Sequence, residues 1–332
     1  AHYVDAMSIN FGEWCSEMGE HLRERPSRAP LYVVFTLYLT VWYAITSRWP
    51  FGENIYNSDW DVLLVLDACR VDTLREVADE YEFIGEVESK WSVGSQSAEW
   101  MANTFTESWR DAINNTTYIS GNGFSKGVLA RGGRPPANNT TPIDLSSWSV
   151  VNDGEFQSHI AVWETHHDET YGSVLPKPMT DYTIEAGRNG DAGRIITHYT
   201  QPHLPYVGAA FREGREATER EDRGYELLEE GKASRDDVYE DYKETLRWVL
   251  DDVEELLENI DAEKVIITSD HGEAFGEWHA YGHPEGFPHS VVRKVPWVET
   301  TATDEHTREP DVEVEDGLEV DIEEHLRDLG YR

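Results

Sequence analysis

Basic residues and cysteines are scarce in this chain of 332 residues. Only 28 residues are lysine or arginine, and just seven of these are lysine, against 65 aspartates and glutamates. A net charge of −37 excludes nucleic acid as a partner, because contacts with phosphate backbones need patches of lysine and arginine. The two cysteines, Cys15 and Cys69, form no CxxC pair, which excludes a disulfide framework and a zinc ribbon.

The acidic residues are spread along the whole chain instead of gathering in one tail. A surface rich in carboxylates and poor in lysine is typical of a protein that works at high salt, where ions screen the self-repulsion. The composition therefore favours a protein adapted to a high-salt environment. The hydrophobic content of 39% is enough for a substantial core.

One stretch has no charge at all. Residues 29–47 are nineteen uncharged residues, which reaches the length of a membrane span. The stretch also contains three threonines, a serine, three tyrosines and a proline. We therefore expect a helix that packs on the main domain, and keep membrane association through 29–47 as the alternative. Residues 1–55 are predicted to form a helical leader.

The rest of the chain alternates between apolar runs and amphipathic segments. Strands are predicted at 59–67, 115–120, 193–199 and 263–270, and helices at 71–81 and 234–260. This alternation predicts an α/β fold with a mostly parallel central sheet flanked by helices. We expect a catalytic domain at 56–300 with a charged insertion at about 207–235. The tail at 301–332 is expected to carry a short helix.

Three predicted strands end in residues that bind metals or phosphate. These residues are Asp67, the pair His198 and His203, and the pair Asp270–His271. In open parallel sheets, ligands bind beyond the carboxyl ends of the strands. One such residue alone would indicate little, but three strand ends with this chemistry at one sheet edge predict a site.

These segments resemble the alkaline phosphatase superfamily, and within it the sulfatase and phosphoglycerol-transferase branch. The resemblance covers about residues 58–300 and looks closest to sulfatase-like proteins of haloarchaea. Together with the composition, this resemblance implies the cytoplasm of a high-salt archaeon as the location, with a cell-surface or virion-associated location as the alternative. The segments that carry it are SDHGE (269–273), YGHP (281–284), RKVPWV (293–298), VLDACR (65–70) and THYTQPHLPY (197–206). The resemblance implies an alkaline-phosphatase-like fold and an enzyme that acts on phosphate or sulfate esters.

The resemblance also implies a nucleophile in the stretch SVGSQSAEWMANTF (92–105). Setting Thr104 on the threonine that follows the family's nucleophile places Ser95 at the nucleophile, with Ser97 as the second choice. A serine that merely caps the following helix is the structural alternative. Cys69 lacks the proline and arginine of the formylglycine signal, so a serine nucleophile is expected, as in the phosphoryl-transferring branch.

The family pattern further implies one divalent metal ion, held by Asp67, Ser95, Asp270 and His271. A second metal site looks incomplete, because His203 and Val207 stand where two-metal members have aspartate and histidine. An imidazole ligand favours Mn²⁺ or Zn²⁺, with Mg²⁺ or Ca²⁺ as alternatives. The remaining implied roles are contacts to the reacting group for His203 and His283, and oxyanion contacts for Arg70 and Asn122.

The function expected from these features is a metal-dependent hydrolase or transferase of phosphate or sulfate esters. Its substrate would be a small-molecule or glycan ester, with a glycan or a polyol favoured. One alternative is a catalytically silent sulfatase-fold protein with a structural or binding role. The other is a membrane-anchored phosphoglycerol-type transferase that uses residues 29–47 as its anchor.

Overall fold

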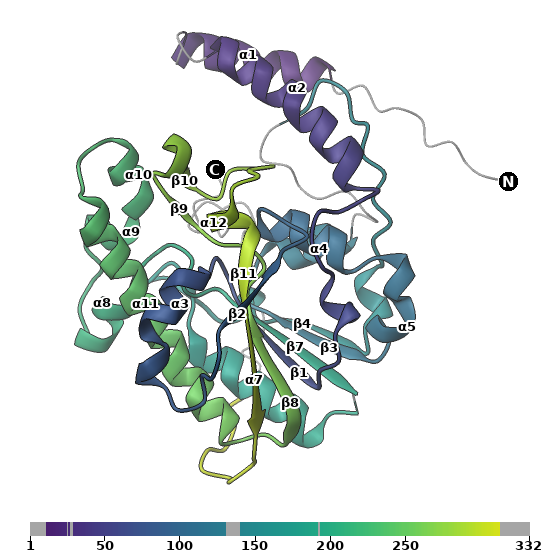
Figure 1. The fold of residues 1–332 in the computed structure, drawn as a ribbon, viewed down its shortest axis with the longest axis vertical. Coiled ribbons are helices and arrows are strands. Elements are labelled where there is room, and N and C mark those ends of the chain that lie inside the picture. Colours follow the sequence, from purple (N-terminus) through teal and green to yellow (C-terminus); the bar gives the residue numbers. More distant parts are fainter. Residues whose placement is uncertain (1–10, 25, 27–28, 131–139, 192, 313–332) are drawn as a thin grey trace, which may run out of the picture.

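A seven-stranded sheet forms the centre of the protein in the computed structural model, which describes residues 11–24, 26, 29–130, 140–191 and 193–312. The strand order is β2-β11-β8-β1-β7-β3-β4 (Figure 1). The strands are β1 (Val62–Leu66), β2 (Glu88–Trp91), β3 (Thr116–Ser120), β4 (Ser158–Ala161), β7 (Arg194–Tyr199), β8 (Ala262–Thr268) and β11 (Lys294–Ala302). Strands β8, β1, β7, β3 and β4 are parallel, and β11 is antiparallel to both of its neighbours.

The central strand β1 is buried on both faces, as its continuous apolar run predicts. Val62, Leu64 and Leu66 belong to one hydrophobic cluster, and Leu63 and Val65 belong to another. Alternate side chains of a strand point to opposite faces of the sheet, so the two clusters are the two sides of the core.

Three helices cover the face of Leu64: α3 (Val71–Val77), α7 (Pro176–Asn189) and α11 (Arg235–Leu257). Helix α11 begins where the sequence predicts, because the Ser234 side chain accepts a hydrogen bond from the Asp237 amide. The face of Leu63 is covered by α4 (Ser97–Thr104), α5 (Arg110–Ile113) and α6 (Phe124–Ala130). The sheet therefore lies between two layers of helices.

The remaining elements are short and lie around this sandwich. The charged insertion forms α8 (Gly208–Glu213), α9 (Glu219–Asp222) and α10 (Gly224–Glu229). The small strand pairs are β5 (His167–Asp168) with β6 (Ser173–Val174), and β9 (Ala274–Phe275) with β10 (Tyr281–Gly282); α12 (Ser290–Arg293) precedes β11. The 3₁₀ turns are η1 (Ile55–Asn57), η2 (Ala78–Glu80), η3 (Glu107–Trp109), η4 (Asp153–Glu155), η5 (Val162–Glu164) and η6 (Glu277–His279).

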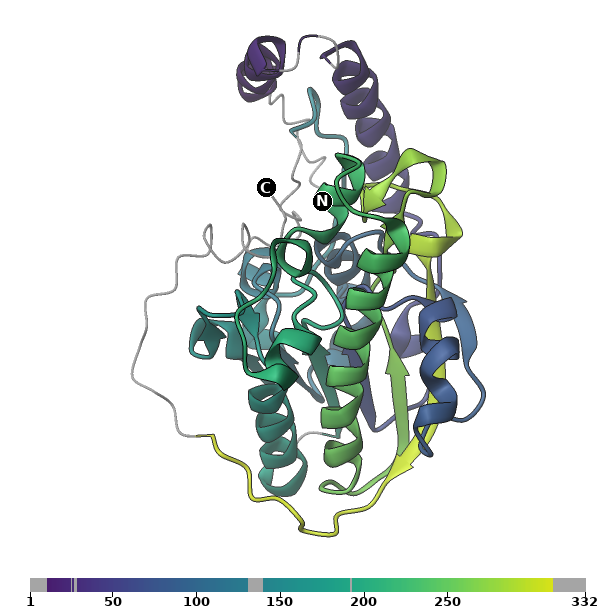
Figure 2. The same ribbon diagram turned by 90° about the vertical axis from the view of Figure 1, so that its left-hand side faces the viewer.

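Two helices at the N-terminal side, α1 (Phe11–Glu24) and α2 (Ala29–Thr46), project from one end of the sandwich (Figures 1 and 2). Helix α2 is the one helix of the described residues that is long and apolar enough to cross a membrane, and 39% of it is buried. Its buried residues lie along one side, so α2 is packed on the protein along that side.

The predicted fold class, a mostly parallel sheet flanked by helices, is confirmed by the strand order and the helix layers. The division into a leader, a catalytic domain at 56–300 and a tail stays a prediction. The predicted C-terminal helix falls within 313–332, outside the described residues.

Candidate metal and ester site

The site lies where β1, β7, β3 and β8 end. Asp67 follows β1 directly, and the Asp270–His271 pair follows β8, the neighbour of β1 in the sheet. His198 is the last residue but one of β7, which lies on the other side of β1, and Asn122 comes just after β3. The sequence prediction that these strand ends meet at one edge is confirmed by this strand order.

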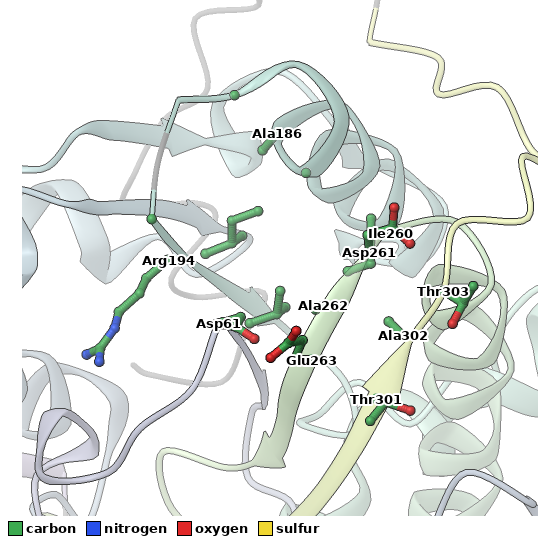
Figure 3. Close-up of a pocket in the computed structure, with 15 residues that line it drawn as sticks. Asp61, Ala186, Arg194, Ile260, Asp261, Ala262, Glu263, Thr301, Ala302 and Thr303 are labelled. Atoms are coloured by element: carbon green, nitrogen blue, oxygen red, sulfur yellow. The ribbon is translucent and has the colours of Figure 1, made fainter.

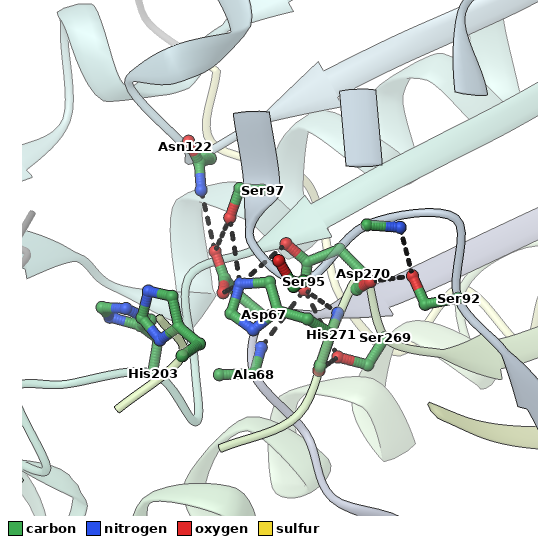
Figure 4. A network of polar contacts seen from close by, with 12 residues as sticks. Asp67, Ala68, Ser92, Ser95, Ser97, Asn122, His203, Ser269, Asp270 and His271 are labelled. Carbon is green, nitrogen blue, oxygen red and sulfur yellow. Dashed lines mark hydrogen bonds and ion pairs between the residues drawn. The ribbon is translucent and has the colours of Figure 1, made fainter. Parts of the chain in front are cut away.

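Asp67, Asp270 and His271 form a compact group of ligands. One ligand atom from each of the three lies within 4.8 Å of the others, and all three residues are buried. His271 Nε2 is 3.4 Å from Asp67 Oδ1 and 3.4 Å from Asp270 Oδ2 (Figure 4). Asp67 Oδ1 is buried without a hydrogen-bond donor among the described residues. Two carboxylates and an imidazole, with one carboxylate oxygen that receives no donor, are ligands that suit a divalent cation.

The protonation of these groups also fits a cation. Burial and the neighbouring Asp270 carboxylate raise the pKa of Asp67 well above its usual value. Burial would raise the pKa of Asp270 as well, but His271 and His198 beside it hold that pKa below its usual range. Burial lowers the pKa of His271 to about 4, so its imidazole is neutral at pH 7. His271 Nδ1 donates to the Gly272 carbonyl oxygen at 3.0 Å, which leaves the Nε2 lone pair for a metal.

A second group of ligands lies beside the first. His203, Glu273 and His283 also offer ligand atoms within 4.8 Å of one another. The His271 and His283 rings have centroids 4.4 Å apart, so the two groups are adjacent. Glu273 Oε2 is buried without a hydrogen-bond donor among the described residues. The sequence prediction of an incomplete second metal site rested on His203 and Val207. It left out Glu273, although this residue is the last one of the SDHGE motif.

Burial controls the charge of this second group. It lowers the pKa of His203 to about 3 and that of His283 to about 4, and it raises the pKa of Glu273 to about 7. His283 Nδ1 is 3.1 Å from Glu273 Oε1. At neutral pH the group therefore consists of two neutral imidazoles and a carboxyl group that is close to its own midpoint.

The two serines considered as nucleophiles have different surroundings. Ser97 Oγ lies 3.3 Å from Asp67 Oδ2 and 3.4 Å from His271 Nε2, at the first residue of α4 (Figure 4). Ser95 Oγ donates to Glu99 Oε2 at 2.8 Å and accepts from the Gly286 amide at 2.9 Å. The hydroxyl that contacts the ligand group is therefore that of Ser97, the second choice from the sequence.

The other residues predicted for the site also differ in whether they contact the first ligand group. Asn122 Nδ2 donates to Asp67 Oδ2 at 2.8 Å, so it belongs to the site. The Arg70 guanidinium pairs with Asp72 and Glu277 and donates to the Glu273 carbonyl, and these contacts are not with the first ligand group. Cys69 is buried, as its sequence context predicts.

His198, which the sequence places at one of the three strand ends without a specific role, lies beside the first ligand group. Its Nε2 is 3.7 Å from Asp67 Oδ2 and 3.5 Å from Asp270 Oδ2. Its Nδ1 is 3.1 Å from the Tyr118 hydroxyl. The only signal was its position near the end of a predicted strand, which does not tell a ligand from a core residue.

A cavity of about 630 Å³ opens at the opposite end of the sheet (Figure 3). It is lined by residues at the amino ends of β1, β7 and β8, such as Asp61, Arg194 and Ala262. In parallel sheets the ligand sites lie at the carboxyl ends. This cavity therefore has no part in the site described above.

No protein-family model matches the sequence, and no curated protein matches it. Several solved structures do match it. The soluble domain of lipooligosaccharide phosphoethanolamine transferase A from Neisseria meningitidis has a TM-score of 0.48 and 16% identity, over 78% of this chain and 81% of that chain. A putative sulfatase from Bacteroides thetaiotaomicron has a TM-score of 0.41 and 11% identity, over 73% and 64%. The lipoteichoic acid synthase LtaP from Listeria monocytogenes has a TM-score of 0.39 and 10% identity, over 79% and 71%.

The TM-scores of these three neighbours are all below 0.5, and their identities to this chain are 10–16%. Their names are those of a transferase, a sulfatase and a synthase. The case for an activity rests on the residues of the site.

Proposed function

We propose that this protein is a metal-dependent enzyme that hydrolyses or transfers phosphate or sulfate esters, with Ser97 as its nucleophile. The observation that supports the proposal most directly is the position of the Ser97 hydroxyl, within 3.4 Å of both Asp67 and His271. A buried hydroxyl beside two carboxylates and a neutral imidazole is suited to attack on an ester bound at the same cation.

The residues would act as follows. A divalent cation held by Asp67, Asp270 and His271 would lower the pKa of a bound hydroxyl and neutralise charge on the ester oxygens. Ser97 donates its proton toward Asp67 Oδ2, and the amino end of α4 favours an anionic ester in front of it. Ser97 would then carry the phosphoryl or sulfuryl group until water or an acceptor alcohol takes it.

The second group would serve the leaving group or a second cation. Glu273, with a pKa of about 7, lies next to His283 Nδ1, so this pair can hold a proton close to the reacting ester. His203 completes the group. A polyol or glycan ester is the proposed substrate, since three neutral or protonated groups suit an alcohol leaving group.

The test combines metal analysis with a panel of aryl phosphates, phosphodiesters and aryl sulfates at high salt. We expect the wild type to contain a divalent metal and to turn over at least one ester class. Ser97→Ala should lower kcat by a factor on the order of 10⁴ or more, and Ser95→Ala by far less. The reverse order would return the nucleophile to Ser95. Absence of both metal and turnover would favour the silent binding protein.

We further propose that α2 places the enzyme on a membrane surface, with the cell surface as its location. Its outward side chains are apolar; they are Leu31, Val34, Leu37, Val41 and Ile45. The opposite side of α2 packs on the protein, which favours a helix lying in the interface over one surrounded by lipid. In flotation with neutral lipid vesicles at high salt, the wild type should float with the vesicles. Leu37→Asp with Val41→Asp should remain in the unbound fraction.

A further inference from the structure

Helix α2 is hydrogen-bonded to the loop that carries His283. The Tyr38 hydroxyl donates to the Gly286 carbonyl oxygen at 2.6 Å, and the Tyr43 hydroxyl donates to Glu285 Oε1 at 3.2 Å. Both views place α2 beside β10 and α12, between which this loop runs (Figures 1 and 2). A Cβ added to Gly286 would lie 3.2 Å from the Trp42 ring, so helix and loop are in close contact.

The same helix is bonded to the turn that carries Ser97. Trp42 Nε1 donates to Glu99 Oε1 at 2.8 Å, and Glu99 is two residues after Ser97 in α4. The second oxygen, Glu99 Oε2, accepts from the Ser95 amide at 2.7 Å and from Ser95 Oγ at 2.8 Å. Arg293 Nη1 lies 3.2 Å from this oxygen, and both charged side chains are buried. Glu99 therefore joins α2 to the backbone just before the nucleophile.

Ser95 connects the two sets of contacts. Its hydroxyl accepts from the Gly286 amide at 2.9 Å, and the next residue, Gln96, donates to Glu285 Oε1 at 3.1 Å. The turn before Ser97 and the loop after His283 are thus bonded to each other and to α2. The network leaves little freedom for one segment to move without the others.

We infer that α2 positions the catalytic residues. Trp42 and Tyr38 are positioning residues that hold the Ser97 turn and the His283 loop in fixed positions relative to each other. The inference rests on the proposed function for its catalytic consequence, while the mechanical coupling stands on the contacts alone. A leader helix that only covered apolar surface would not need to donate hydrogen bonds to both segments. A helix resting on a lipid surface would then influence the geometry of the site directly.

The test removes the hydrogen-bond donor and keeps an aromatic ring at each position. Trp42→Phe deletes the N–H that bonds Glu99, and Tyr38→Phe deletes the O–H that bonds Gly286. The matched controls make the same changes elsewhere on the N-terminal side. Trp49→Phe alters an indole that is 71% exposed, and Tyr32→Phe alters a hydroxyl that donates to Glu17 of α1.

Two readouts are compared for each variant. Hydrogen exchange of peptides covering 95–104 and 281–293 should become faster by roughly tenfold in Trp42→Phe and Tyr38→Phe, but not in the controls. With an ester substrate, kcat per titrated active site should fall roughly tenfold, while KM and metal content stay unchanged, because misplacement affects the chemical step. The protonation state of the site and its bound metal would be the same in all variants.

Equal exchange in Trp42→Phe and Trp49→Phe would overturn the inference. A lower melting temperature with unchanged exchange in both segments and unchanged kcat per site would also overturn it, because α2 would then only stabilise the fold. A wild type that turns over no ester would refute the proposed function instead. The exchange comparison would still decide whether α2 holds the two segments.

Discussion

Replacing Glu99 by glutamine tests the buried network under α2. The Glu99 side chain is fully buried, and its partner Arg293 is 2% exposed. Glu99 Oε2 receives three donors, two from Ser95 and one from Arg293, and Oε1 receives the Trp42 indole. A glutamine has one acceptor and one NH₂ group. In either orientation its NH₂ would face at least one of these donors.

The cost follows from this geometry. Removing one partner of a buried ion pair leaves the other charge uncompensated, which costs about 3–5 kcal/mol of unfolding free energy. We expect the lower end of this range, about 3 kcal/mol, because Arg293 Nη2 keeps its bond to the Phe51 carbonyl oxygen. For a chain of 332 residues, whose unfolding entropy is about 0.7 kcal/mol per degree, such a loss lowers the melting temperature by roughly 4 °C.

Urea unfolding at a fixed, high KCl concentration measures the change. The matched control is Glu107→Gln, which removes a charge from the exposed pair with Arg110 and should cost less than about 1 kcal/mol. In Glu99→Gln combined with Arg293→Met, the two effects should differ from additivity by at least about 1 kcal/mol. A loss below about 1 kcal/mol in Glu99→Gln, or strict additivity, would refute the reasoning.

Three further outcomes are expected. Asp270→Asn should lose the co-purified metal and the rise in melting temperature on adding Mn²⁺ or Zn²⁺; full retention in plasma emission analysis would contradict the ligand set. Burial raises the pKa of Glu273 from 4.5 to about 7, so its contribution to the stability of metal-free protein is complete below about pH 4.5 and is lost as pH rises through about 7. Glu273→Gln should weaken this decline in urea unfolding with a chelator present, and an identical pH profile would argue against it. Raising KCl from roughly 0.1 M to roughly 1 M shortens the screening length from about 10 Å to about 3 Å, and should raise the melting temperature because of the net charge of −37. Unchanged melting would exclude adaptation to salt.

The sheet was predictable because its signals are local. The apolar run that becomes β1 ends at an acid, and the periodic segment that becomes α11 has a serine cap. Such patterns depend on a few neighbouring residues and survive in any tertiary context. The apolar stretch 29–47 was equally clear as a helix, but its partners were not. Which side of α2 is covered depends on residues some 60 to 250 positions away.

The sequence by itself determined that Asp67 and Asp270–His271 lie at one sheet edge, because each follows a parallel strand and parallel strands end on the same side. Only the tertiary structure decided between Ser95 and Ser97, because two serines two residues apart at a helix start differ only in the direction of their side chains. It also decided that Glu273 forms a second ligand group with His203 and His283, and that Trp42 contacts Glu99. These contacts join segments that no local pattern relates, so they follow from the packing of the whole chain.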